Sequence, residues 1–375
     1  MRSVLEEVAK LRGGRPATLD RTNTNRYRIL LSEADGSKTA YYFTTPIYRA
    51  SDGKLVNLAF EKKGKTAVYE GSNATVTLAE KIKLTNAEGR CLVSLPGTLG
   101  TVEDEYVKWG GCVLYPTMNG FACKAKSKRG FTFELETTDK SLAVRANDKY
   151  FALMREKFRP FVVVSCIGTV DKEEKTVISA KITYQKTEDD TYLITVQPWK
   201  WHDGEDVLFE INLYENKLLQ DTTVESGSSY SNNAFGTMAY LGNTTFYGEQ
   251  WLYARPDIGR MHELRSARIE SAVLHMPLHA PSDIPLRAFG ITARFCSFGA
   301  NWHNKVHSTP EYTDALLSSD RMDLDVTPFF ADSGTGYLKP TNGWIVKPMV
   351  KNGRFAAVST ADSCFAPLIL EVKFS

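Results

Sequence analysis

The histidines are the first residues whose spacing could do chemistry. The chain has six, and four of them form the pairs His275/His279 in HMPLH and His303/His307 in HNKVH. On a helix, a spacing of four would place both imidazoles on one face, but Pro277 disfavours a helix in the first pair. On a strand the two rings would lie about 13 Å apart, too far to share one metal ion. We therefore expect no metal site, and histidines that are exposed or half-buried.

Paired carboxylates are the second kind of candidate chemistry. Glycoside hydrolysis needs two carboxyl groups about 5 Å or about 6.5–9.5 Å apart. Asp323 and Asp325 would share a face only on a regular strand, and Asp325 fits a turn or strand cap better. The chain also lacks a G-x-S-x-G elbow, a P-loop, a G-x-G-x-x-G turn and an HExxH motif. The sequence therefore predicts a protein that is not an enzyme and needs no cofactor, with a glycan-cleaving enzyme kept as an alternative.

Aromatic side chains offer a third function, the binding of sugars. Sugar rings present apolar C–H faces that stack on Trp and Tyr. The C-terminal candidates for such a surface are Trp251, Tyr253, Trp302, Tyr312, Tyr337 and Trp344. Trp302, within FGANWHNKVHSTPEY, is the best candidate because polar residues and turn formers surround it. The alternative for half or more of these rings is a place in the core.

Cysteine usage gives no sign of a redox or zinc motif. The six cysteines are scattered and form no C-x-x-C pair, which argues against zinc. We expect mostly buried thiols, with a bridge between Cys112 and Cys123 left open. Together with an N-terminus that has no apolar signal region, this favours synthesis in a reducing cytoplasm.

Composition excludes two classes of partner. Charged residues make up 24% of the 375 residues, and the formal net charge is only +2. Such a balance gives no overall attraction to nucleic acid, so we expect no nucleic-acid partner. No apolar run approaches the roughly 18–20 residues of a membrane span, so we expect no membrane insertion.

Alternating short segments dominate the chain and predict its fold class. Turn signals such as Asp35-Gly36, Asp52-Gly53 and Asn119-Gly120 separate them. We predict a mostly β protein with two or three antiparallel β-sandwich domains, the C-terminal one jelly-roll-like. One helix is expected near 147–158, because Tyr150, Leu153, Met154 and Phe158 have helical spacing and Pro160 would end it.

A second, amphipathic helix is predicted at residues 1–14. Val4, Leu5, Val8 and Leu11 have helical spacing, Ser3 is a plausible cap, and Gly13-Gly14 can end the helix. The helix either packs on its own domain or docks on a protein partner. Beyond it we expect a β-rich region at 15–217, as one domain or as two with a break near 125–140, and a sandwich at 218–375.

The C-terminal stretch 218–375 resembles the DNRLRE-type domain, a β-sandwich module related to carbohydrate-binding modules of bacterial surface and secreted proteins. The ordered phrases that carry the resemblance are QDTTVESGSS, ARIESAVLHMPL, NWHNKVHSTPEY, LDVTPFF, GWIVKP, FAAVST and APLILEVKFS. The namesake motif itself is absent, and HELRSARIE is the nearest stretch. The preceding β-rich region is similar to those that precede such domains in large bacterial wall-associated proteins.

This resemblance implies binding or scaffolding at a surface. We expect a structural or adhesive protein of a cell surface or phage-like extracellular particle such as a virion, made in the cytoplasm without a signal peptide. It would self-assemble or join protein partners and contact surface polysaccharide. A monomeric carbohydrate-binding protein is the alternative of a different class.

Overall fold

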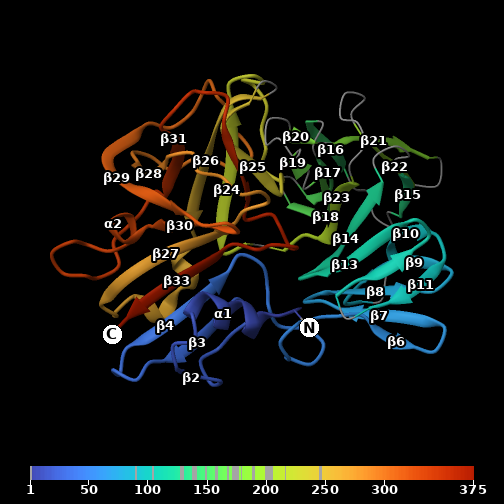
Figure 1. Ribbon diagram of the computed structural model, residues 1–375, viewed down its shortest axis with the longest axis horizontal. Coiled ribbons are helices and arrows are strands. Elements are labelled where there is room, and N and C mark those ends of the chain that lie inside the picture. The colour runs from blue at the N-terminus through green and yellow to red at the C-terminus, as the bar shows by residue number, and fades with distance from the viewer. Residues whose placement is uncertain are drawn as a thin grey trace. The chain divides into compact units, whose positions relative to one another are not determined.

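The computed structural model describes residues 2–88, 91–103, 105–126, 131–136, 142–147, 150–156, 159–166, 169–170, 177–178, 180–187, 191–198, 206–215, 217–244 and 247–375. These residues form mostly antiparallel strands, as Figure 1 shows. The prediction of a mostly β protein built from antiparallel sandwich domains is therefore confirmed. Two compact units divide the chain, which we call unit 1 and unit 2.

Unit 1 contains residues 1–11 and most of 46–216. One of its eight-stranded sheets runs in the order β21 (Ala180–Lys186), β22 (Thr191–Pro198), β15 (Phe131–Glu136), β10 (Cys91–Pro96), β9 (Lys81–Asn86), β8 (Ala74–Leu78), β7 (Thr66–Glu70) and β6 (Glu61–Lys63). The other runs in the order β11 (Leu99–Val102), β12 (Val107–Trp109), β13 (Cys112–Thr117), β14 (Gly120–Lys126), β23 (Asp206–Leu213), β18 (Arg159–Cys166), β17 (Tyr150–Glu156) and β16 (Leu142–Asn147). Two short pairs also belong to the unit: β1 (Arg2–Ser3) with β5 (Asn57–Leu58), and β19 (Thr169–Val170) with β20 (Val177–Ile178).

The predicted helix near 147–158 is wrong. Its described residues are extended: Asn147 ends β16 and 150–156 form β17. Strand β17 pairs on one edge with β16 and on the other with β18, so backbone bonds along both edges outweigh a helical spacing of four apolar residues. Pro160, which was expected to end this helix, lies in strand β18.

Unit 2 contains residues 12–45 and 217–375. Its strands follow one path: β2 (Thr18–Leu19), β3 (Arg28–Ser32), β4 (Lys38–Phe43), β33 (Ile369–Phe374), β27 (Ile269–Pro277), β30 (Arg321–Asp325), β29 (Ser308–Leu317), β28 (Leu286–Ile291), β31 (Trp344–Pro348), β26 (Gly248–Pro256), β25 (Met238–Thr244) and β32 (Phe355–Ser359). Strand β24 (Leu219–Glu225) pairs with β26. Short helical turns lie at η1 (Ile258–Arg260), η2 (His262–Leu264) and α2 (Thr327–Phe330).

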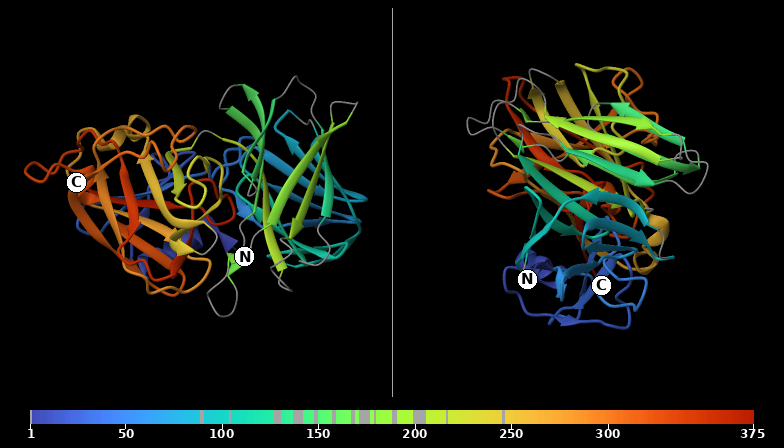
Figure 2. Two further views of the ribbon diagram at one scale, coloured as in Figure 1. Left: turned by 90° about the horizontal axis from the view of Figure 1, so that it is seen from above. Right: turned by 90° about the vertical axis from the view of Figure 1, so that its right-hand side faces the viewer.

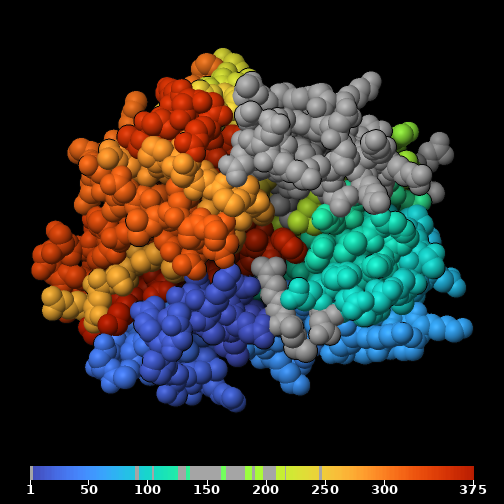
Figure 3. Space-filling view, viewed as in Figure 1, coloured from blue at the N-terminus to red at the C-terminus, as the bar shows by residue number. Residues whose placement is uncertain are grey.

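The boundaries of unit 2 differ from those predicted. Strand β4 pairs with β33 from Lys38↔Phe374 to Phe43↔Ile369, so residues 12–45 complete the C-terminal sheet instead of belonging to a region 15–217. In Figure 3 the blue surface of this segment borders the red surface of β33, the strand with which it pairs. The predicted break near 125–140 falls partly outside the described residues.

One apolar core lies between the two layers of strands in unit 2, which Figure 2 shows edge-on. Leu274 and Leu370 enter it from one layer, and Leu252, Val346 and Trp344 enter it from the other. The intervening residues of β26 and β31 therefore point away from the core, since successive side chains of a strand alternate between faces.

The N-terminal helix α1 spans Val4–Arg12. Ser3 and Glu6 cap it reciprocally: the Glu6 amide donates to Ser3 Oγ (3.2 Å), and the Ser3 amide donates to Glu6 Oε2 (2.9 Å). The glycines that follow have positive φ, 58° at Gly13 and 80° at Gly14, as a helix end needs.

The apolar residues of α1 are only partly available to a partner. Val4 and Val8 are buried within the chain, and Leu11 is half-buried. Leu5 is the exposed member, with 41% of its surface accessible. Of the four residues predicted for docking, Val4 and Val8 therefore pack on the protein itself.

Candidate glycan-binding surface

The candidate site lies on the outer face of the β24–β26–β31–β28–β29 layer of unit 2. Tyr253 of β26 is paired with Ile345 of β31, and Ile345 is paired with Phe289 of β28. Phe289 is in turn paired with Tyr312 of β29. Because cross-strand partners share a face, these side chains form one row directed away from the core.

Two of the predicted aromatic residues are buried and cannot meet a ligand. Trp344 lies in the core between the two layers, with none of its surface accessible. Tyr253 is on the outer face, but it is also fully buried, and its hydroxyl donates to the carbonyl of Val306 (2.7 Å). These two residues therefore have the alternative role considered from the sequence, a place in a core.

The β28–β29 loop, residues 292–307, covers Tyr253. Phe295 and Ala300 of this loop pack with Val224, Tyr253 and Ile345 in a small second core. The polar β24–β25 loop, residues 226–237, holds the covering loop in place: Asn232 Nδ2 donates to the carbonyls of Ser297 (2.6 Å) and Ala300 (2.8 Å), and the Trp302 amide donates to the carbonyl of Ser229 (3.0 Å). The Ser/Asn-rich stretch thus supports the site as well as connecting two strands.

Four rings at the margin of this loop remain at least partly accessible, and we call them the aromatic surface. They are Trp251, Phe289, Trp302 and Tyr312. The Trp251 and Trp302 rings lie 4.6 Å apart between centroids, tilted by 50°, and the Phe289 and Tyr312 rings lie 5.7 Å apart. Tyr312 is the most accessible, at 47%. Three of the predicted candidates therefore come together here.

Three cations alternate with these rings. Lys305 Nζ lies 4.5 Å from the Trp302 centroid, and Lys347 Nζ lies 4.5 Å from the Trp251 centroid and 5.2 Å from that of Phe289. The Arg287 guanidinium lies 4.2 Å from the Tyr312 ring. Each is within cation–π range, so the surface combines apolar faces with positive charge.

Sequence reasoning missed Phe289 and a neighbouring pair, Tyr230 and His303. The Tyr230 and His303 rings stack with centroids 4.2 Å apart, and Tyr230 is 79% exposed. His303 also contacts Ser229 Oγ through Nε2 (2.9 Å). The available signal was a single tyrosine inside SSYSNN, since an aromatic residue among small polar ones has no neighbours with which to form a core.

The carboxylate candidate Asp323 belongs to an ion-pair network. His275 of β27 lies between two carboxylates, with Nδ1 2.7 Å from Asp323 Oδ1 and Nε2 3.2 Å from Glu371 Oε2. Burial opposes the charged imidazole, but these two bonds outweigh it and raise the pKa of His275. Burial likewise opposes the charged form of Asp323, and its bonds to His275 and Arg321 lower its pKa nonetheless.

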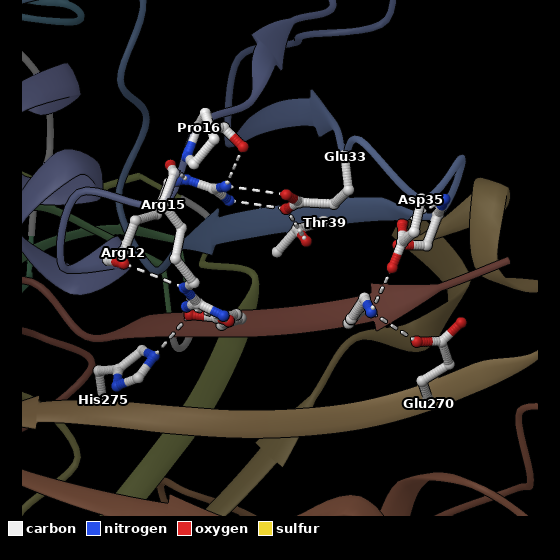
Figure 4. A network of polar contacts seen from close by, with 11 residues as sticks. Arg12, Arg15, Pro16, Glu33, Asp35, Thr39, Glu270 and His275 are labelled. Carbon is white, nitrogen blue, oxygen red and sulfur yellow. Dashed lines mark hydrogen bonds and ion pairs between the residues drawn. The ribbon is translucent and has the colours of Figure 1, made fainter.

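The network continues to the N-terminal segment of unit 2, as Figure 4 shows. Arg15 Nη2 lies 3.8 Å from Glu371 Oε1, and Arg12 pairs with Glu33 (2.7 Å). Lys373 bridges Asp35 (3.1 Å) and Glu270 (3.0 Å). Both carboxylates beside His275 are therefore engaged in ion pairs, and the His275 imidazole contacts both of them.

Asp325, the second carboxylate considered from the sequence, has a local structural role. Its Oδ1 accepts the Thr327 amide (2.9 Å) at the start of α2. This is the turn or cap role expected for it.

No group of three or more His, Cys, Asp or Glu side chains in the described parts of the chain is arranged to hold a metal ion. In the HMPLH pair, His275 is ion-paired, whereas His279 contacts Ser359 Oγ through Nε2 (3.0 Å). Cys112 and Cys123, considered for a bridge, are free thiols on β13 and β14 that hydrogen-bond to each other.

Comparison with known proteins does not assign the chain to a family. No protein-family model matches the chain, and no curated protein matches it. Among the described residues, no helix combines the length and the apolar character needed to span a membrane.

Proposed function

We propose that this protein is a non-enzymatic structural or adhesive protein of a cell surface or a phage-like extracellular particle, and that unit 2 contacts surface glycan. The observation that carries the proposal is the aromatic surface on the outer face of unit 2. Trp251 contacts Trp302 there, and Tyr312 contacts Phe289 on the same face. Rings at a surface are what the C–H faces of sugars stack upon.

Two further features support the proposal. The rings are carried by strands of one sheet layer and by a loop that Asn232 and Ser229 anchor, so contacts within the protein hold the rings in place. The resemblance of 218–375 to a module related to carbohydrate-binding modules points in the same direction.

The test of glycan contact is a binding panel of cell-wall and capsular polysaccharides, measured by calorimetry. Replacing Tyr312 by Ala should weaken binding by about 1–3 kcal/mol, the range expected for a lost aromatic contact in an accessible site. Tyr337 provides the matched control, because it is equally exposed, at 50%, and lies in the loop between α2 and β31. Tyr337→Ala should bind as the wild type does. Equal losses in both variants, or no binding to any polysaccharide, would refute the proposal.

Self-assembly is tested separately, by the native mass from light scattering. A discrete multimer or filament supports a structural particle component, whereas a 41.9 kDa monomer that binds glycan favours the alternative, a carbohydrate-binding protein acting alone. Removal of residues 1–12 would confuse this test, because it deletes the buried Val4 and Val8 and the ion-paired Arg12. Leu5→Glu changes only an exposed position, so it should lower the mass without unfolding the protein if α1 docks.

A further inference from the structure

Two lysines of the aromatic surface face one tryptophan ring. Lys347 Nζ lies 4.5 Å and Lys305 Nζ 5.8 Å from the centroid of Trp251. The two come from different segments, β31 and the β28–β29 loop, so the fold brings them together. Both lysines are half-buried, and their like charges repel each other.

The electrostatic environment of Lys347 shows that its charged form is disfavoured beside Lys305. Burial lowers the pKa of Lys347, and the charge of Lys305 lowers it further, against an opposing effect of Glu249. The site thus holds two cations whose charges the protein only partly compensates.

Neither lysine forms an ion pair with a carboxylate of the described residues. Lys305 Nζ donates to the carbonyl of Trp302 (2.8 Å), and Lys347 Nζ donates to Ser308 Oγ (2.9 Å). An ammonium has three N–H donors, so each retains donors for a ligand. By contrast, Arg287 is paired with Asp314 (2.6 Å).

Glu249, the acid whose charge acts on Lys347, already has other partners. Its Oε1 accepts Trp251 Nε1–H (2.8 Å), and its Oε2 pairs with Lys351 (2.7 Å). Glu249 therefore orients the Trp251 ring at its edge, and its second oxygen is paired with Lys351.

We propose that the aromatic surface selects acidic glycans that contain uronic acid, with the sugar carboxylate received between Lys305 and Lys347 and the sugar ring stacked on the neighbouring aromatic side chains. This inference rests on the proposed glycan contact and names the class of glycan. A uronic acid carries an apolar ring face and a carboxylate in the same residue, as the alternating rings and cations require. A neutral sugar leaves the lysines without a counter-charge, and a polyol phosphate has no ring to stack.

The experiment compares oligosaccharides of galacturonate, glucuronate and mannuronate with their carboxyl-reduced, neutral counterparts. The full-length protein should bind at least one acidic oligosaccharide about tenfold or more tighter than its reduced form, a difference typical of one charge-assisted contact. Lys347→Gln and Lys305→Gln should each remove most of this preference. Lys38→Gln, which removes an exposed charge from β4 on the other layer of unit 2, should keep it.

The outcomes separate the inference from the proposed function. Equal binding of acidic and reduced forms would overturn the preference for uronic acid while leaving glycan contact intact. Binding to a polyglycerol phosphate as tight as to the uronates would also overturn it, because charge alone would then suffice. Absence of binding to all of these and to the neutral polysaccharide panel would overturn both. Unfolding midpoints of the lysine variants should equal or exceed that of the wild type, since each variant relieves repulsion.

Discussion

Arg12 and Glu33 form a two-pronged ion pair, in which Nη1 lies 2.7 Å from Oε1 and Nη2 lies 2.8 Å from Oε2. The same guanidinium donates to the carbonyls of Arg15 (3.0 Å) and Pro16 (3.2 Å), so it fixes the turn that follows α1. Planar pairing of this kind is the strong form of an ion pair, and both side chains are largely buried. The last residue of α1 is thereby bound to the residue that follows β3.

Loss of this pair should destabilise unit 2. Arg12→Ala leaves a buried carboxylate without its cation, and we expect a loss of about 2–4 kcal/mol in the free energy of unfolding, measured with urea. Arg15→Ala is the control: its side chain is 63% exposed and lies 3.8 Å from Glu371, so its loss should stay below about 1 kcal/mol. Similar losses in the two variants would show that the geometry of the Arg12 pair contributes nothing.

The His275 network should make stability depend on pH. Because the pKa of His275 is raised in the folded state, its contribution is complete below the unfolded value of 6.5 and is lost as the pH rises through the folded value. Asp323 acts in the opposite sense, since its pKa is lowered: its contribution is present above 3.8 and is lost as the pH falls through the folded value. His275→Gln should therefore cost most stability at pH 6 and progressively less towards pH 9, as measured by urea midpoints. If the loss of stability in His275→Gln does not change with pH, the interpretation that His275 is charged in the folded state is wrong.

Asp221 should be a destabilising acid at neutral pH. It is fully buried on β24, and burial raises its pKa to about 6, although Lys217 and the Ala361 amide (2.7 Å) oppose this. The folded state then favours the protonated form, so stability is complete below 3.8 and falls as the pH rises to about 6. Asp221→Asn should gain about 1–3 kcal/mol at pH 7.5, where the charge is removed, and little at pH 4. Asp362→Asn, which breaks the pair with Lys217, should instead destabilise.

Gly242 should tolerate no side chain. Its φ is +151°, and a Cβ there would lie 2.2 Å from the Arg354 carbonyl and 2.5 Å from Phe355 Cα on the paired strand β32. Gly242→Ala should cost more than about 3 kcal/mol, because backbone must move. Gly353→Ala, at a φ of +80° with open space around it, should cost about 1 kcal/mol. Thermal unfolding of both variants separates steric overlap from backbone strain.

Part of the fold could be predicted because local alternation agrees with the final environment. The stretch QDTTVES forms β24 as expected, and the Ser3 cap and Gly13-Gly14 stop delimit α1. The prediction of a helix around Tyr150 failed because helical spacing is a local signal. The extended structure of β17 depends instead on its pairing with β16 and β18.

The aromatic residues of the candidate site could be predicted from the sequence, but which of them are exposed could not. The sequence WLYAR places Trp251 and Tyr253 on one face of β26, but the loop that buries only Tyr253 begins about forty residues later. For Trp344 a signal was present: Lys347 is three positions along the same strand and thus on the opposite face, so the tryptophan faces the core. The contacts of His275 with Asp323 and Glu371 join three separate strands, and no local pattern carries them.

The pairing of β4 with β33 has a consequence for biosynthesis. A ribosome releases residues 38–43 early, yet their partner strand at 369–374 emerges only after all of unit 1 and most of unit 2 have been made. During that interval the edge of β4 presents unpaired amides and carbonyls, which is the kind of surface that recruits chaperones or seeds aggregation. Nascent chains halted before β33 should therefore be the most dependent on folding assistance, even though unit 1 is already complete.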